Sequence, residues 1–244
     1  MLDLDKLNTL AADHSDARRA IALASEAFAY TRETVREMDQ WLTREPTRYG
    51  AGEAERKLEA ADRACEALIR SLKSSDALAR PFAELRSELQ RAKIDLRSEI
   101  GEVVSQVNGL ESAAAERIKE AATTISAEFV KAEKAQLGVL NLVAEALRAK
   151  NEKRPVDAQV RSKAEAIAKT VGAALAVANQ QYLAHSGSVL TFRSTRERLE
   201  KYLGRRVDAS NKVDATFPEK ARQAVERLKG WKDDIDRKLR SEFA

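Results

Sequence analysis

Apolar and polar residues alternate along the chain with the period of an α-helix, most clearly in the first segment. From Asp3 to about Arg44 the seam positions are three and four residues apart, without a break, over five repeats. This is the heptad spacing of a helix that covers a narrow seam with a second helix. The sequence therefore predicts one continuous N-terminal helix with a self-association seam. The seam residues are Leu7, Leu10, His14, Ala17, Ile21, Ala24, Phe28, Thr31, Val35, Met38 and Leu42.

The middle of the chain predicts two further helices. The first begins near Glu53 and runs to about Leu72. A polar stretch and then Pro81 interrupt it, because proline cannot donate the helical hydrogen bond. From there to about Lys150 the apolar residues recur every 3.6 residues or so, as in a nearly straight helix. Asn108-Gly109 could end this helix, but the apolar positions keep their phase across it, so we expect it to be continuous.

The C-terminal third predicts three shorter helices. Pro155 suits the first turn of a helix, which we expect to end at residues 185–188 (His-Ser-Gly-Ser). Ser194 and Glu197 have the spacing of a capping box and predict the start of a short helix. Residues 216–219 (Thr-Phe-Pro-Glu) repeat that spacing and predict the start of the last helix.

Together these elements predict an all-α protein, an elongated antiparallel helical bundle or coiled coil of about five or six helices, two of them long. The composition agrees, with 43 alanines against 12 aromatic residues. Alanine favours the helix, and its small side chain lets two helices approach closely. We expect residues 1–184 to form a long-helix coiled-coil bundle. Residues 185–244 are expected to form a basic helical segment docked on that bundle, not an independent domain.

Few side chains in the sequence have the pattern of a catalytic or metal site. A single cysteine, Cys65, excludes a disulfide framework, and its place on an apolar helix face indicates a small buried side chain. Residues 13–16 (Asp-His-Ser-Asp) resemble a ligand set, yet a polar residue at the seam position of His14 more often fixes helix pairing. Phosphate-binding glycine loops, dinucleotide motifs and His-Glu-x-x-His are missing from the sequence. We therefore expect no enzymatic activity, no cofactor and no metal.

The net charge of +4 conceals an uneven distribution. Residues 1–147 contain 21 Lys and Arg against 26 Asp and Glu, a net charge of −5, whereas residues 148–244 contain 22 against 13, a net charge of +9. One explanation is a solvated basic face that pairs with the acidic half of the chain. The other is binding of lipid headgroups or nucleic acid, whose phosphates suit arginine. The anion-binding candidates are Arg193, Arg196, Arg198, Lys201, Arg205 and Arg206.

These patterns favour function through binding. We expect a non-catalytic structural or interaction protein that self-associates, or scaffolds a protein partner, through its long coiled-coil helices. A helix of the same chain could also cover the seam. The alternatives are a peripheral protein on anionic lipid and a sequence-independent nucleic-acid-binding protein. The most apolar run, residues 171–178, is too short for a transmembrane segment, and a free cysteine suits a reducing compartment. The expected location is therefore the cytoplasm.

Overall fold

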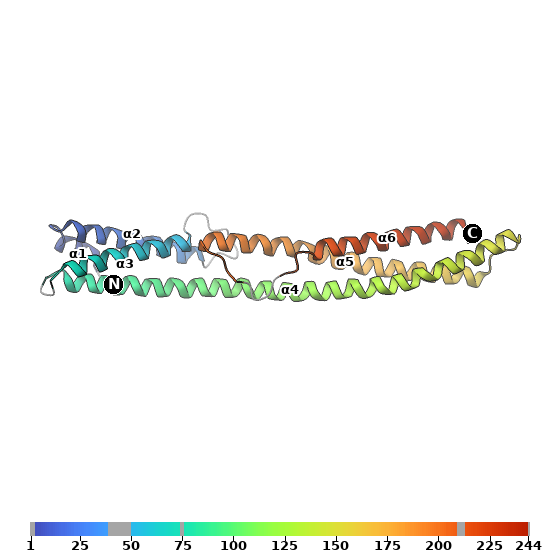
Figure 1. Ribbon diagram of the computed structural model, residues 1–244, viewed down its shortest axis with the longest axis horizontal. Helices are drawn as coiled ribbons and strands as arrows, with labels where there is room; N and C mark the ends of the chain where they lie inside the picture. The colour runs from blue at the N-terminus through green and yellow to red at the C-terminus, as the bar shows by residue number, and fades with distance from the viewer. Residues whose placement is uncertain (1–2, 39–49, 74–75, 209–212, 244) are drawn as a thin grey trace. The chain divides into compact units, whose positions relative to one another are not determined.

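The computed structural model describes residues 3–38, 50–73, 76–208 and 213–243, and the regular elements in these ranges are all α-helices (Figure 1). The prediction of an all-α fold with two long helices is confirmed: α4 has 73 residues and α5 has 46, although the sequence predicts a shorter helix where α5 lies. The described helices are α1 (Leu4–Leu10), α2 (Ser15–Met38), α3 (Ala51–Ser71), α4 (Ala79–Asn151), α5 (Ala158–Leu203) and α6 (Phe217–Ser241).

The chain divides into two compact units, each built from two stretches of sequence. The first unit comprises Met1–Gly109 and Thr195–Ala209, and the second comprises Leu110–Ser194 and Ser210–Ala244. Both α4 and α5 therefore contribute residues to each unit. Residues 185–244, for which the sequence predicts a basic helical segment docked on the bundle, are shared between the two units, and that division of the chain stays a prediction.

The predicted continuous N-terminal helix is wrong, because the chain leaves α1 after Leu10 and starts again as α2 at Ser15. The backbone N–H of Ala17 donates to Nδ1 of His14 at 3.3 Å. N–H groups in the first turn of a helix have no partner within the helix, and a polar side chain just before it can supply one. The polar residues 13–16 therefore mark a helix start, and His14 acts there as a cap.

The helix stop expected at residues 185–188 is also wrong, as is the start expected at Ser194 and Glu197. α5 runs through all of them without interruption. Val189 and Leu199 are buried on the same side of α5 as Ala178, so the covered face keeps its phase through the Ser-Gly-Ser stretch. A glycine inside a helix costs only about 1 kcal/mol, which a continuous packed face offsets.

Two predictions about α4 agree with the structure. Asn108-Gly109 lies inside α4, as the unbroken phase of its apolar positions predicts. Pro81 lies in the first turn of α4, where its missing N–H breaks no helical hydrogen bond.

The last helix starts at its predicted position, with Thr216 as the N-cap, but the side chain of Thr216 makes no capping hydrogen bond. α6 begins at Phe217, followed by Pro218. Oδ1 of Asp214 accepts hydrogen bonds from both N–H and Oγ1 of Thr216, at 2.8 and 2.7 Å. The two groups of the predicted capping box have other partners: Oγ1 of Thr216 donates to Asp214, and Glu219 accepts from Arg222.

Small side chains bring α2 and α3 together in the first unit. Ala17, Ala24, Ala54 and Ala61 are all 0% exposed. Alanine at these positions keeps the distance between the helix axes short. The same core takes larger side chains from the other helices of the unit, including Phe82, Leu85, Leu89 and Leu96 of α4 and Leu199, Tyr202 and Leu203 of α5.

Polar side chains favour the antiparallel contact of α3 with α4 in this unit. Four polar pairs join the two helices: Glu55–Arg97 at 3.0 Å, Glu59–Lys93 at 2.6 Å, Asp62–Gln90 at 3.4 Å and Glu66–Arg86 at 3.2 Å. From one pair to the next, the residue number rises on α3 and falls on α4 by the same step, so the helices are antiparallel. A shift by one helical turn would break these four pairs but would bring Glu55 opposite Lys93 and Asp62 opposite Arg86, so the charges favour the antiparallel contact without selecting one register by themselves. Lys93 also lowers the pKa of Glu59 through its hydrogen bond.

Glycine allows the start of α3 to touch the end of α5. A Cβ atom added to Gly52 would lie 2.4 Å from the backbone oxygen of Leu203. Gly204 follows with φ of 66°, a conformation that glycine adopts without strain. The Oη of Tyr202 donates to the backbone oxygen of Thr34 on α2 at 3.3 Å. The close approach of Gly52 to Leu203 and the hydrogen bond of Tyr202 together join α2, α3 and α5 within the first unit.

The second unit packs residues 110–151 of α4 against α5 and α6. Its core is one cluster of apolar side chains, and alanines again occupy many of the closest positions on α4 and α5. The ring of Phe129 lies 4.9 Å from that of Trp231, joining α4 to α6. The buried residues of this cluster include Ile118, Ile125 and Val139 of α4, Val171, Ala174 and Ala178 of α5, and Phe217, Leu228 and Ile235 of α6.

We expect Gly52→Ala to destabilise the protein by more than about 1 kcal/mol, because its methyl group would force two backbones apart. Gly101→Ala is the matched control: it also lies in a helix, but an added Cβ meets nothing within 4 Å. That change should stabilise α4 by up to about 1 kcal/mol. Chemical denaturation followed by far-UV circular dichroism measures both. Equal effects of the two substitutions would contradict the close contact.

Candidate functional site

Most of the described seam residues lie inside the first unit. Leu7, Ile21 and Met38 are buried in its core, and Phe28 and Val35 pack against it partly buried. The unit therefore supplies the intramolecular cover that the sequence left open as an alternative.

The rest of the seam has a different environment. Leu10 is 62% exposed, and the half-buried His14 caps α2. Leu42 lies outside the described residues. Self-association through the seam stays a prediction, and it would have to use what the first unit leaves uncovered.

Two of the six basic candidates are partly buried. Arg196 donates to the backbone oxygen of Val207 at 2.8 Å and to Oδ1 of Asn108 at 3.1 Å. It therefore fastens the chain after α5 to α4, which is a structural task. Arg198 is half-buried as well.

The other four basic candidates are exposed. Arg193 belongs to the second unit, whereas Lys201, Arg205 and Arg206 belong to the first. Among the described residues, no ion pair involves the side chains of these last three. Phosphate binding by the basic stretch therefore stays a prediction. In the first unit, three of its cations are exposed to solvent.

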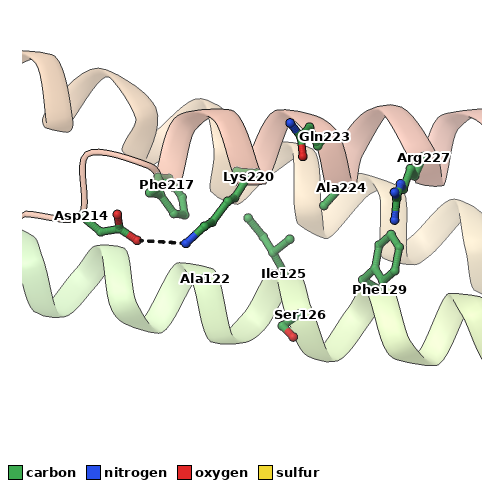
Figure 2. A pocket seen from close by; sticks show the side chains of 11 residues that line it. Ala122, Ile125, Ser126, Phe129, Asp214, Phe217, Lys220, Gln223, Ala224 and Arg227 are labelled. Atoms are coloured by element: carbon green, nitrogen blue, oxygen red, sulfur yellow. Dashed lines mark ion pairs between the residues drawn. The ribbon is translucent and has the colours of Figure 1, made fainter.

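A groove in the second unit lies between α4 and the start of α6 (Figure 2). It has a volume of about 380 Å³, and apolar side chains form most of its wall. Lys220 lies at the rim, 3.9 Å from a carboxylate oxygen of Asp214. The lining residues are Ala122, Ile125, Ser126 and Phe129 of α4, Asp214, and Phe217, Lys220, Ala221, Gln223, Ala224 and Arg227 of α6.

The groove does not assemble a catalytic group. Ser126 is its one hydroxyl-bearing side chain, and the lining residues include no histidine to act as its base. Two hydrogen bonds from Thr216 lower the pKa of Asp214, so this carboxylate stays ionised and is a weak base. A nucleophile needs a base of suitable pKa within hydrogen-bond reach. Most of the lining offers apolar contact.

Cys65 is the buried hydrophobic residue that its position on α3 predicts. The thiol is free and 0% exposed. Burial raises its pKa to about 11, so the reactive thiolate is scarce at neutral pH.

Within the described ranges, no group of three or more His, Cys, Asp or Glu side chains is placed to hold a metal ion. None of the helices described is long and apolar enough to cross a membrane.

The second unit leaves one row of large apolar side chains uncovered on α4. Val130, Leu137, Leu140 and Leu147 are 43%, 61%, 57% and 43% exposed. We call these four residues the α4 stripe. On a helix of 3.6 residues per turn they share one face, and the side chains that α4 packs into the unit, such as Val139, point the other way. Single exposed leucines are ordinary, whereas several large apolar side chains on one face favour an interaction surface.

The sequence contained a signal for the stripe that the longer apolar pattern obscured. The four residues are seven, three and seven positions apart, which is heptad spacing. They form a second apolar row on a helix whose main row is covered. The sequence does not show which of the two rows is covered, because this depends on how α5 and α6 pack against α4.

Comparison with known proteins adds no identity to this geometry: no protein family, curated protein or solved structure matches the chain.

We expect a thiol reagent to modify Cys65 slowly in the folded protein and quickly after unfolding. A raised pKa also means that the protonated thiol favours folding below the ordinary value of 9.0, and that this contribution is lost as pH rises towards about 11. Denaturation between pH 8 and pH 11 should therefore show a steeper loss of stability in the wild type than in Cys65→Ala. Rapid labelling of the native protein would contradict the burial.

Proposed function

We propose that this protein is a non-catalytic helical scaffold that self-associates through the α4 stripe. The observation that carries the proposal is the row of four uncovered apolar side chains in heptad spacing on a continuous helix. Such a row gains free energy when another apolar surface removes it from water, about 25 cal/mol for each Å².

The remaining chemistry supports a binding role. Cys65 is buried with a raised pKa, and the groove between α4 and α6 lacks a nucleophile with its base. Polar side chains that pair closely, such as Glu59 and Lys93, hold α3 against α4. Most described polar contacts thus build the helical framework.

The size of the stripe sets the expected strength. From Val130 to Leu147 the helix rises about 26 Å, so two copies would bury less than the roughly 1,200 Å² of a standard interface. Association should therefore be weak and depend on concentration.

Light scattering coupled to size exclusion, run over a range of protein concentrations, tests the proposal. The wild-type mass should rise from the 27.0 kDa of one chain towards twice that value. The double substitution Leu137→Gln with Leu140→Gln should keep the protein at the mass of one chain, because glutamine removes the apolar surface at little cost in helix propensity.

The matched control is Leu183→Gln with Leu190→Gln on α5. These leucines are each 69% exposed, belong to the same unit and are also seven positions apart. The control should associate like the wild type. A wild type that keeps the mass of one chain at every concentration would reject the proposal.

A second candidate function is binding of a phosphate-bearing surface by the first unit. The observation that favours it is the set of three exposed cations, Lys201, Arg205 and Arg206, at the end of α5. They carry no acidic partner among the described residues, so binding phosphates would not break an ion pair.

For this candidate we expect weak binding to vesicles that contain phosphatidylserine, or to a single-stranded oligonucleotide, that falls steeply with salt. Reversing the three cations to Glu should abolish binding. Reversing Arg18, Arg19 and Arg91, which are also exposed, changes the net charge equally and should preserve it. Equal losses in both triple variants would indicate an effect of net charge alone, which would count against a site at the end of α5.

A further inference from the structure

The α4 stripe has a spacing that reads the same in both directions. Its gaps of seven, three and seven residues are unchanged when the helix is reversed. A two-fold axis between residues 138 and 139 therefore places Val130 opposite Leu147 of a second copy, and Leu137 opposite Leu140. Two-fold dimers use the same surface patch on both subunits. We propose that the stripe is covered by the α4 stripe of a second copy in antiparallel orientation, an inference that rests on the proposed self-association.

Glu133 decides between the two orientations. It lies on the stripe between Val130 and Leu137, and it is exposed. In a parallel pair in register, the two copies of Glu133 would face each other inside the apolar seam, where like charges repel. In the antiparallel pair Glu133 faces Ala144 of the second copy, which is small and also exposed.

Arg148 completes the arrangement. In the antiparallel pair it lies four residues beyond Ala144 of the second copy, about 6 Å further along the helix. A glutamate side chain that passes over an alanine can reach that guanidinium. Within its own chain, Arg148 is exposed and no described ion pair involves it. The two-fold axis repeats the contact, so each pair of copies gains two such ion pairs.

The flank of the stripe has a second complementary pair. At about 100° per residue, Lys134 and Glu145 project from the same side of α4. Two-fold symmetry brings that side of one copy next to the same side of the other. Lys134 and Glu145 of the second copy then differ by two residues, or about 3 Å, along the axis. A parallel pair would hold them about 16 Å apart.

Spin labels on the full chain test the orientation. Labels are placed one at a time on Asn141→Cys, close to the axis, and on Ala127→Cys, far from it, both at exposed positions on one flank. Antiparallel pairing separates the two Asn141 positions by about 8 Å along the helix and the two Ala127 positions by about 34 Å. Pulsed electron resonance should give a short distance for the first label and a long one for the second. The wild type, whose buried Cys65 takes up no label, is the background control.

The outcomes separate this inference from the function on which it rests. Equal short distances from both labels would show a parallel pair and overturn the inference, while self-association would stand. A dimer whose labels give neither pattern would place the interface elsewhere and overturn it too. A chain that keeps the mass of one copy would reject the proposed function itself.

A charge exchange provides a second, independent measurement. Glu133→Lys should weaken the dimer several-fold, as should Arg148→Glu. The double variant should recover most of the wild-type affinity, because it restores the pair between copies with its signs exchanged. In a parallel dimer, residues 133 and 148 lie more than 20 Å apart and the double variant could not recover. Failure of this rescue would overturn the antiparallel pairing, whereas single variants with unchanged circular dichroism confirm that the fold is intact.

Discussion

Close approach of helices through small side chains is the constraint on which the rest of this structure depends. Ala17 and Ala24 of α2 and Ala54 and Ala61 of α3 are each fully covered, yet each buries little area. A seam of this kind is narrow, and alanines on neighbouring turns are nearly interchangeable. Apolar packing alone would therefore tolerate a slip by a turn. Other interactions must select the register, and between α2 and α3 they are the ion pair of Lys57 with Glu26 at 2.6 Å and the hydrogen bond that the N–H of Gly50 donates to Oη of Tyr30 at 3.2 Å.

Narrow seams also determine where function can lie. A helix packed through a thin line of alanines leaves most of its circumference in water, and ionic side chains occupy most of that surface. An apolar side chain outside the seam then has no partner within its unit. This explains how Leu137 and Leu140 stay exposed only a few residues from Val139 and Leu142, which are covered. The exposed residues of the α4 stripe are therefore a consequence of narrow helix–helix contacts, not of a poorly packed core.

The sequence predicted the helical fold and several of its boundaries, and its errors have a common physical cause. The unbroken phase of apolar residues correctly kept Asn108-Gly109 inside α4. The apolar phase also continues across Ser186-Gly187-Ser188, where the local turn signal predicts a stop that α5 does not make. At His14 the reverse holds: the heptad phase predicts one continuous helix, but His14 caps a new one. Local capping signals and apolar periodicity each fail where packing against a neighbouring helix decides the helix boundary. The sequence does not show which helix that neighbour is.

The candidate interaction surface was hidden from the sequence for a related reason. A heptad row predicts that some surface will cover it, but it does not say whether that surface belongs to the same chain. The N-terminal row containing Ile21 and Met38 is covered largely within the first unit, whereas the row containing Leu137 and Leu140 is not covered by the second. Both rows have similar spacing, so the periodicity does not show which of the two rows is covered by its own chain. Once one row has its cover inside the chain, the apolar row without cover is the better candidate for an interface with another molecule. On α4, the palindromic spacing, the exposed Glu133 and Arg148, which no described ion pair involves, support an orientation as well as a place for the proposed interface.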